Sequence, residues 1–473
     1  MNRSILLCGL FIASFAQANT SSSYDVETIA VPKGQTLHVT GLDVDPEGNV
    51  YCATRYGDVW IYNNKGEWAQ FAEGLQEPCG LLVDDDGSVV VTQKPEMTRL
   101  VDTNNDGVAD KYLTLSNAFD FHNNYHEYNY GGVKDRDGNY VGTLNLAAGP
   151  RVPGLKMGAM TSAGGYRGWA YKVTPKGEFI PFANGMRSPA GIGKNGEGEL
   201  FYTDNQGDYV GTSQLNHLQE GKFYNHPLSL LEKGFSAEKL KGMEDEAFDA
   251  MRTLPVVWIP QAELANSPGN PEWNATKGKF GPFDDQFFIG DQTRSNVFRA
   301  TLQKVGGRYQ GCVIDFLSGF QSGAIRLKFD QKGALWIGET GRGWAARGAK
   351  LYGLQKVTWN GKMPFEILDV KLVKEGFRVS FTQKISFDSL VDSEINLSRW
   401  WYQYHRIYGS PKVGEKSVPI HNMEILPDQQ TLMIRCNVVK EQVYCLDLSS
   451  VLNIEGNALG NVKAYYTVVN LVD

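Results

Sequence analysis

Long apolar runs are almost absent from this 473-residue sequence. Beyond its first residues, no segment approaches the roughly 20 consecutive apolar residues that a membrane-spanning helix needs. The sequence also lacks a Gly-x-Ser-x-Gly nucleophile elbow, a dinucleotide-binding fingerprint and a phosphate-binding loop. These absences argue against a helical membrane protein and give no support to a serine hydrolase, a nicotinamide enzyme or a nucleotide hydrolase.

Basic residues are outnumbered by acidic ones, 46 Lys and Arg against 53 Asp and Glu, which gives a formal net charge of −7. Nucleic acids and membrane surfaces bind basic faces, so neither partner is expected. The six cysteines form no Cys-x-x-Cys pair, and five of them follow the leader segment described next. That number is odd, and Cys436 and Cys445 are interpreted equally well as a disulfide or as free thiols.

The first 18 residues have the pattern of a secretory signal peptide. Arg3 supplies a positive charge, residues 5–15 form a short apolar run, and Ala16-Gln17-Ala18 has the small-x-small pattern of a cleavage site. We therefore expect residues 1–18 to be removed and the mature protein to be secreted or periplasmic.

One pattern recurs along the chain: an apolar strand, a turn of the form Asp/Asn-x-x-Gly, and a second apolar strand. Clear copies stand at residues 41–51, 80–90, 132–140, 191–200 and 325–336, with a weaker one at 286–299. Such turns favour tight hairpins, because glycine readily adopts positive φ. A spacing of roughly 40 to 60 residues suits four-stranded blades. The sequence therefore predicts an all-β protein with a β-propeller over residues 19–363.

The remaining segment, residues 364–473, is also rich in predicted strands. Residues 377–381 and 431–435 alternate apolar and polar side chains, as half-buried strands do. Six blades are counted by Lys356, so the C-terminal segment is either a seventh blade or a separate β-sandwich. One helical candidate, residues 236–251, is interpreted as a surface insertion.

Two of the seven histidines, His122 and His126, precede a predicted strand that starts at Tyr128. The start of an inner strand faces the central funnel of a propeller, and a neutral imidazole is the usual general base near neutral pH. His126 is therefore a candidate catalytic base and His122 a candidate substrate contact. A zinc pair is not expected, because residues i and i+4 of a strand lie about 13 Å apart. The alternative is a histidine that only hydrogen-bonds within the funnel.

Tyr171 and Arg187 are two further candidate catalytic residues. Tyr171 lies in a predicted strand, where packing is the alternative role. Arg187 lies just before a strand, and a guanidinium at the funnel rim can hold a carboxylate through two hydrogen bonds. A structural contact with backbone carbonyls is the alternative for Arg187. Polar and aromatic residues near the rims of later blades complete a predicted set of substrate contacts: Asn205, Tyr224, Arg294 and Arg342.

Residues 102–110 place oxygen ligands at the spacing of a calcium loop, with glycine at position six. The predicted ligands of a structural calcium, or of another divalent metal, are Asp102, Asn104, Asp106 and Asp110. Leu113 stands where such a loop has its bidentate glutamate. A solvated Asp/Asn turn is therefore the alternative interpretation.

Residues 41–364 resemble the sorbosone-dehydrogenase-like and soluble quinoprotein sugar-dehydrogenase propellers. The resemblance implies a propeller fold, a sugar substrate and a catalytic base at the position of His126. A Gly-Asp motif that follows the next strand in those enzymes is replaced here by Thr143-Leu144-Asn145-Leu146. The motifs that carry the resemblance are Gly-Met-Arg-Ser-Pro at 185–189, Thr-Asp-Asn-Gln-Gly-Asp at 203–208, Gly-Asp-Gln-Thr-Arg at 290–294, Gly-Arg-Gly-Trp at 341–344 and Tyr-Gly-Leu-Gln at 352–355.

The chain also resembles the propeller-type ulvan lyases in the order and spacing of His126, Tyr171 and Arg187. This resemblance implies β-elimination from a uronate-containing anionic polysaccharide. His126 and Tyr171 would act as base and acid, Arg187 would neutralise the carboxylate, and no cofactor is required. An exported, monomeric lyase is the main prediction. The alternatives are a sugar dehydrogenase that uses pyrroloquinoline quinone, and a glycan-binding propeller without catalytic activity.

Overall fold

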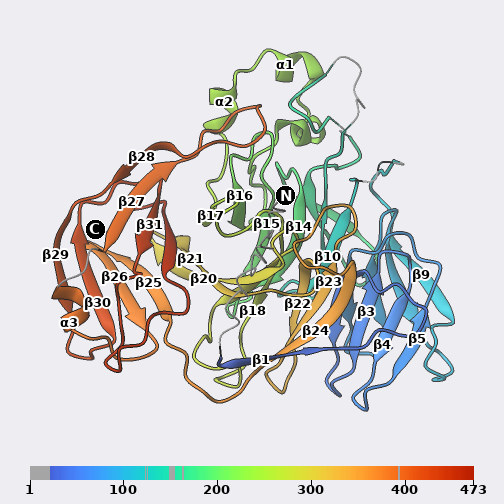
Figure 1. Cartoon of the computed structure of the whole chain (residues 1–473). Coiled ribbons are helices and arrows are strands. Elements are labelled where there is room, and N and C mark those ends of the chain that lie inside the picture. The colour runs from blue at the N-terminus through green and yellow to red at the C-terminus, as the bar shows by residue number, and fades with distance from the viewer. Residues whose placement is uncertain are drawn as a thin grey trace, which may run out of the picture.

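The structure of the chain is a computed structural model that describes residues 22–122, 124, 126–148, 155–161, 164–391 and 395–472. The predicted signal peptide lies outside these ranges. Among the helices of the described ranges, none is both long and apolar enough to cross a membrane. Strands dominate the molecule, and they form six blades and a C-terminal pair of sheets (Figure 1).

The first four blades are four-stranded antiparallel sheets whose strands follow chain order from the inner strand outwards. Blade one comprises β2 (Val39–Val44), β3 (Val50–Thr54), β4 (Val59–Tyr62) and β5 (Trp68–Ala72). Blade two comprises β6 (Gly80–Val83), β7 (Val89–Thr92), β8 (Met97–Val101) and β9 (Lys111–Ser116). Blade three comprises β10 (Asn129–Lys134), β11 (Tyr140–Leu144), β12 (Trp169–Val173) and β13 (Phe179–Asn184). Blade four comprises β14 (Pro189–Lys194), β15 (Leu200–Asp204), β16 (Ser213–His217) and β17 (Val257–Ile259).

Blades five and six complete the ring. Blade five comprises β18 (Pro268–Trp273), β19 (Phe287–Asp291), β20 (Asn296–Val305) and β21 (Arg308–Ser318). Blade six comprises β22 (Ala324–Phe329), β23 (Leu335–Thr340), β24 (Tyr352–Trp359) and, as its outer strand, the N-terminal β1 (Tyr24–Thr28). The inner strands β2, β6, β10, β14, β18 and β22 pack side by side in that order, and β22 packs against β2. The ring is therefore closed within blade six, where the N-terminal strand β1 pairs with β24 from the end of the propeller segment.

The five clear copies of the Asp/Asn-x-x-Gly pattern form the turn between the first two strands of blades one, two, three, four and six, whereas the weaker copy at 286–299 spans β19 and β20 of blade five. In blade three, Asp135 Oδ1 accepts a hydrogen bond of 2.8 Å from the Asn139 amide, and Gly138 has a φ of 82°. A side chain at this φ would be strained, so glycine is the residue that the turn favours. The repeat thus marks the blades because it marks their inner hairpins.

The propeller axis is filled by small residues and by one arginine. A Cβ atom on Gly80 would lie 2.5 Å from the backbone of Gly131, so only glycine allows these neighbouring inner strands to approach so closely. The buried Arg326 guanidinium donates to the carbonyl oxygens of Thr40, Ala190 and Cys79 at 2.7, 2.7 and 3.1 Å. One side chain therefore ties the inner strands of blades one, two, four and six together.

Residues beyond blade six form a β-sandwich, which we call the C-terminal sandwich. One of its sheets has the order β25 (Ile367–Val373), β26 (Gly376–Phe381), β30 (Thr431–Cys436) and β29 (Ile420–Ile425). The other has the order β32 (Lys463–Val468), β31 (Gln442–Asp447), β27 (Asn396–Trp401) and β28 (Val413–Ser417), and β32 pairs with β21 of blade five. The predicted all-β propeller is thus confirmed, in the form of six blades and a sandwich.

The few helices lie outside the blades. The insertion between β16 and β17 contains a 3-10 helix (Pro227–Lys233), α1 (Ala237–Lys241) and α2 (Asp245–Asp249), so the predicted helix over 236–251 is divided into two short ones. A further turn of helix, α3 (Asp388–Val391), lies in the C-terminal sandwich. Cys436 and Cys445 are free thiols, and no disulfide joins the cysteines of the described chain.

Candidate functional site

A cavity of about 310 Å³ opens at one end of the propeller axis, and we call it the funnel cavity. The start of the inner strand of every blade contributes to it, through Thr40, Cys79, Tyr128, Ser188, Ser267 and Ile325. The residues that follow the second strands contribute as well, through Arg55, Asn205, Gln292 and Arg342. A larger cavity of about 540 Å³ lies at the other end of the axis, where the Asp/Asn-x-x-Gly turns gather. None of the predicted catalytic residues lines that second cavity.

His126 lies in the funnel cavity just ahead of β10, and its ring orientation is fixed by the backbone. Nδ1 lies 2.9 Å from the carbonyl oxygen of Leu146, which can only accept, so Nδ1 carries the proton in the neutral ring. Nε2 is then the basic nitrogen, and it lies 3.5 Å from Ser188 Oγ. Burial, joined by the positive charge of Arg187, lowers the pKa of His126 to about 4. The imidazole is therefore neutral near pH 7 and able to accept a proton.

Arg187 lies beside His126 and is held by a buried carboxylate. Its Nε donates to Asp208 Oδ1 at 2.7 Å, and Asp208 Oδ2 accepts from His226 Nε2 at 2.9 Å. Burial acts to raise the pKa of Asp208, but the hydrogen bond from His226 and the charge of Arg187 outweigh it and hold this pKa well below its usual range. The ionised carboxylate fixes the guanidinium at the cavity wall.

Two buried polar atoms of the funnel cavity have no hydrogen-bond partner within the described ranges: Asn205 Oδ1 and Arg342 Nη1. Buried polar atoms are normally paired, so such atoms at a cavity wall indicate a polar ligand. The guanidinium of Arg342 also lies 4.4 Å from the ring centroid of Tyr56. The structure therefore brings together four of the predicted site residues: His126, Arg187, Asn205 and Arg342.

Arg55 and Tyr128 are cavity residues that were missed in the sequence. Arg55 Nη2 donates to the Tyr128 hydroxyl at 2.8 Å, and the Tyr128 ring centroid lies 5.5 Å from that of His126. The sequence does carry a signal for Arg55: it directly follows the second strand of blade one, as Asn205 follows that of blade four. Extending the comparison of equivalent blade positions to the first blade would have found it.

Tyr171 requires a correction, because the structure does not bring it to the funnel cavity. It is fully buried inside blade three, where its ring stacks on Phe179 and its hydroxyl donates to Asn129 Oδ1 at 2.8 Å. Burial raises its pKa beyond the normal range for a tyrosine. The packing role that the sequence left open for Tyr171 is the one that the structure supports.

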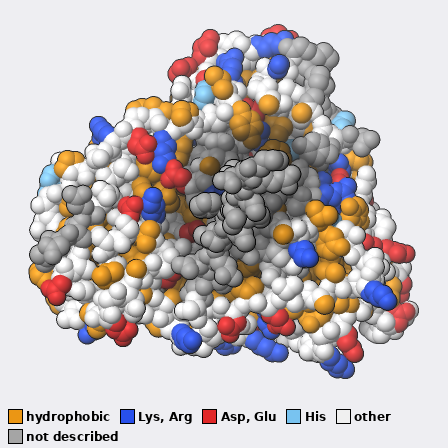
Figure 2. Space-filling model, in the orientation of Figure 1, with side chains coloured by type: hydrophobic (Ala, Val, Ile, Leu, Met, Phe, Trp, Pro, Cys, Tyr) orange, Lys and Arg blue, Asp and Glu red, His pale blue; other side chains and the backbone are white. Residues whose placement is uncertain are grey.

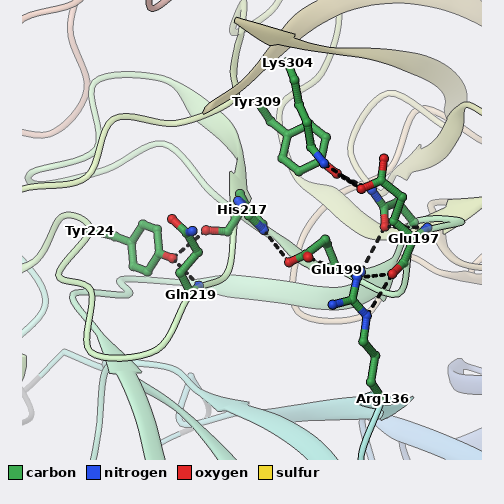
Figure 3. Close-up of polar contacts among 9 residues, drawn as sticks. Arg136, Glu197, Glu199, His217, Gln219, Tyr224, Lys304 and Tyr309 are labelled. Carbon is green, nitrogen blue, oxygen red and sulfur yellow. Dashed lines mark hydrogen bonds and ion pairs between the residues drawn. The ribbon is translucent and has the colours of Figure 1, made fainter. Parts of the chain in front are cut away.

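Tyr224 also lies apart from the cavity, and its predicted sugar contact needs correction too. Its hydroxyl accepts from the Gln219 amide at 2.8 Å and donates to the His217 carbonyl at 2.5 Å. Figure 3 shows Tyr224 at one end of a chain of contacts that continues from the His217 ring to Glu199 and Arg136. This network connects blades three and four, so Tyr224 is structural.

Arg294 and His122 do not line the funnel cavity. Arg294 lies at the rim of blade five, where its guanidinium donates to the Ala262 carbonyl and its backbone amide donates to Asp291 at 2.7 Å. His122 is exposed, with Nδ1 at 3.4 Å from Glu127 Oε1. Neither residue is therefore placed for a direct contact in the cavity.

The predicted calcium ligands lie in the exposed turn between β8 and β9. Asp102 accepts from the Gly107 amide at 2.8 Å, and Asp110 accepts from the Thr103 amide at 3.2 Å. Asp106 accepts from Asn104 Nδ2 at 3.0 Å. No group of three or more His, Cys, Asp or Glu side chains suited to a metal occurs in the part of the chain that the structure describes. The turn thus satisfies its carboxylates with its own donors.

Lysine, arginine, aspartate and glutamate side chains are interspersed on the face of the molecule that Figure 2 shows. The gathering of Arg55, Arg187 and Arg342 around one cavity is therefore a local feature in a chain whose formal net charge is −7. Guanidinium groups bind carboxylates and phosphates through paired hydrogen bonds. Arg55 and Arg187 are already paired with Glu77 and Asp208. Arg342, whose Nη1 has no partner within the described ranges, is therefore the guanidinium best suited to a ligand that carries negative charge.

Comparison with known proteins gives a family model and a fold. Residues 64–258 match the model described as a domain of unknown function (DUF7133). No curated protein sequence matches significantly. Among solved structures, a protein of Thermus thermophilus assigned as an oxidoreductase (glucose dehydrogenase) is 17% identical with a TM-score of 0.52, covering 71% of this chain and 99% of that one.

Two further solved structures give the same result. The PQQ-bound aldose sugar dehydrogenase of Streptomyces coelicolor is 16% identical with a TM-score of 0.50, covering 72% of this chain and 99% of that one. A protein of Carbohydrate-Active Enzymes Family AA12 from Trichoderma reesei is 13% identical with a TM-score of 0.52, covering 72% and 97%. At these identities the likeness establishes the fold alone, which is a β-propeller.

Proposed function

We propose that the protein is a sugar dehydrogenase that uses a bound quinone such as pyrroloquinoline quinone. One observation carries the proposal: the funnel cavity of the propeller combines a neutral, backbone-oriented His126 with three guanidinium groups. This arrangement supplies a base for a hydroxyl proton and cations for an acidic cofactor. It favours the alternative prediction from the sequence over the lyase.

The residues of the cavity fit such a cofactor. Pyrroloquinoline quinone is a flat tricarboxylate. Arg342 has an Nη1 without a partner within the described ranges for one carboxylate, and Arg55 and Arg187, which hold Glu77 and Asp208 through Nε, add positive charge nearby. Asn205 Oδ1 and Arg342 Nη1, which have no partner among the described residues, provide an acceptor and a donor for further polar contacts. The cavity volume of about 310 Å³ lies at the lower end of the usual range for small-molecule sites.

The chain's own residues then supply the proton chemistry. Oxidation of a sugar hydroxyl breaks its O–H and C–H bonds and forms a carbonyl. His126 Nε2 accepts the hydroxyl proton, and the hydrogen bond from Nδ1 to Leu146 stabilises the imidazolium that forms. When bound, the quinone would accept the C–H hydrogen with its two electrons. Arg187 keeps its orientation during this change through Asp208.

Dye reduction tests the proposal directly. Purified protein is mixed with pyrroloquinoline quinone, calcium, an electron-accepting dye and a panel of aldoses. We expect reduction that depends on both quinone and sugar, and a loss of at least about 100-fold in His126→Ala, the usual scale for a general base. Arg136→Ala, on a turn at the opposite end of the propeller, serves as the control. Quinone binding without any sugar-dependent reduction, or no quinone binding at all, would contradict the proposal.

The β-elimination predicted from the sequence is a second candidate, and Tyr128 is the observation that favours it. Its hydroxyl lies in the funnel cavity with His126 and Arg187, so it replaces Tyr171 as the available proton donor. Burial raises the pKa of Tyr128 to about 12, which keeps the hydroxyl protonated. In this reaction His126 would remove the C5 proton of a uronate while the C4–O bond breaks. An increase in the ultraviolet absorbance of ulvan, caused by unsaturated uronate ends and lost in Tyr128→Phe, would decide for elimination.

A further inference from the structure

The C-terminal sandwich reaches the funnel cavity through one loop. The loop between β27 and β28, residues 402–412, runs from the sandwich towards α2 (Figure 1). Arg406 Nη2 forms an ion pair of 3.0 Å with Asp245 of α2, and the Tyr209 amide donates to the His405 carbonyl at 2.8 Å. The loop is therefore fixed on blade four by both backbone and side-chain contacts.

Tyr408 is the residue of this loop that enters the site. It lines the funnel cavity, and 54% of it remains exposed. Its backbone pairs with that of Asp208, the carboxylate that holds Arg187, and its ring centroid lies 5.0 Å from the Arg187 guanidinium. An aromatic ring that is both fixed in position and exposed at a cavity wall is a binding surface. In the free protein much of its apolar area remains in contact with water, so a ligand that covers the ring gains the free energy of burying that area.

A second exposed aromatic residue lines the same cavity from blade six. Trp344 is 55% exposed and belongs to the segment between β23 and β24. Blades four and six are separated by blade five in the ring, so Tyr408 and Trp344 enter the cavity from different sides. His126, by contrast, is largely covered and oriented by the backbone. The chemistry therefore lies inside the cavity, and the aromatic surfaces lie where the cavity meets solvent.

We propose that Tyr408 is a substrate-binding residue that stacks on the second sugar ring of an oligosaccharide whose first ring is oxidised beside His126. This inference rests on the proposed function and adds the substrate class: a saccharide of two or more rings. The apolar C–H face of a pyranose suits a tyrosine ring, and the cavity of about 310 Å³ is too small to enclose several rings. The sandwich thereby selects what the propeller oxidises.

The solved propellers are matched over almost their whole length, whereas this chain is not. The matches cover 97–99% of the three structures above and of two more like them, but only 70–72% of this chain. More than a quarter of this chain is therefore additional to what those propellers match. The C-terminal sandwich lies beyond the six blades, and its loop of residues 402–412 contributes Tyr408 to the wall of the funnel cavity.

Equilibrium binding measured by calorimetry tests the proposal without relying on turnover. The probes are glucose, cellobiose, cellotetraose and oligosaccharides from partially hydrolysed ulvan. We expect the full-length protein to bind two-ring or longer probes more tightly than one-ring probes, and Tyr408→Ala to reduce that gain by about tenfold, or about 1.4 kcal/mol. Tyr408→Trp should retain the gain. Ile407→Ala, an exposed neighbour outside the cavity, is the matched control.

The outcomes separate this inference from the proposed function. Binding of the longer probes that Tyr408→Ala leaves unchanged, or weakens equally for one-ring and longer probes, would overturn the inference and leave the dehydrogenase intact. Tyr408-dependent binding without dye reduction would support the stacking role of Tyr408 on longer saccharides, but would overturn the dehydrogenase and with it the oxidation of the first ring. Failure of the unaltered protein to bind any of these sugars would overturn both. Circular dichroism of each variant shows that the fold is retained.

Discussion

The propeller and the C-terminal sandwich bury their strands in different ways. The inner strands of the propeller surround an axis filled by glycines and by the charged Arg326, whose donors occupy backbone carbonyls of several blades. The two sheets of the sandwich face each other across an apolar core that includes Ile367, Phe377, Leu432 and Tyr466. One region is centred on polar contacts and the other on apolar packing.

This difference explains why the chemistry lies in one region and its support in the other. Strand ends that converge on an axis leave room for polar side chains at the funnel, as Arg55 and Asn205 show. Two sheets that face each other over their whole length leave no such opening. The sandwich therefore contributes to the site only through a loop, and its largest structural connection to the propeller is the pairing of β32 with β21.

The largest expected effect comes from removing the polar centre of the propeller. Arg326→Met would leave the carbonyls of Thr40, Cys79 and Ala190 without their donor, and buried groups left unpaired each cost about 1–3 kcal/mol. We expect a loss of about 3–5 kcal/mol in the free energy of unfolding, or failure to fold. Denaturant titration measures it. Arg378 is exposed on the sandwich, so Arg378→Met should change the free energy of unfolding little. Equal losses in the two variants would contradict the polar centre that distinguishes the propeller from the sandwich.

The next largest effect is expected from breaking the strand pairing that joins the sandwich to the propeller. Ala464 lies on β32, in register with Ile314 of β21 and with Leu446 of β31. Proline there removes an amide from a central strand, so we expect a cost of about 2–4 kcal/mol that falls mainly on the sandwich. Thermal unfolding should change from one transition to two, and limited proteolysis should release a propeller fragment. Glu415→Pro on the edge strand β28 is the control, and a single unshifted transition in Ala464→Pro would contradict the expectation.

The fold could be predicted from the sequence because the blades repeat. Each Asp/Asn-x-x-Gly turn is a local signal, decided by residues three positions apart, and five clear copies establish the period. The pairing of β21 with β32 joins residues about 150 positions apart, and no local pattern encodes it. This is the physical reason why the sequence left a seventh blade and a sandwich equally open.

The site could be predicted in part. His126, Arg187, Asn205 and Arg342 follow from their positions at strand starts and ends, which a propeller brings to its axis. Tyr171 lies inside a blade instead, because side chains alternate along a strand and the direction of each depends on the exact register. Tyr224 lies in the insertion between β16 and β17, where its ring packs against that of Tyr202. Tyr408 could not be found at all, since its approach depends on how a separate sandwich docks.

A smaller effect is expected in the pH dependence of stability, where one titratable group in each region acts in the opposite direction. Burial raises the pKa of Glu366, at the start of the sandwich, from 4.5 to about 7. The protonated carboxyl group therefore contributes fully to the free energy of unfolding below pH 4.5, and this contribution is lost as the pH rises through about 7. His126 has its pKa lowered to about 4, so its contribution is full above the ordinary histidine pKa of 6.5 and is lost as pH falls through about 4. We expect Glu366→Gln to flatten the alkaline side of the stability profile and His126→Gln the acid side. Unfolding midpoints across pH measure both, and an exchange of the two effects would contradict the assignment.

The smallest expected effect compares two exposed aspartate turns. In the propeller, Asp106 accepts from the Val108 amide at 2.9 Å; in the sandwich, Asp428 accepts from the Thr431 amide at 3.0 Å. Alanine at either position should cost about 1 kcal/mol, the usual value for one such hydrogen bond. Because both turns satisfy their carboxylates with their own donors, we expect calcium to leave both unfolding midpoints unchanged in calorimetry. If calcium instead raises the midpoint of the unaltered protein and of Asp428→Ala, but not of Asp106→Ala, the propeller turn binds the ion that its sequence spacing predicts. The two regions would then differ in ligand binding even at their surface turns.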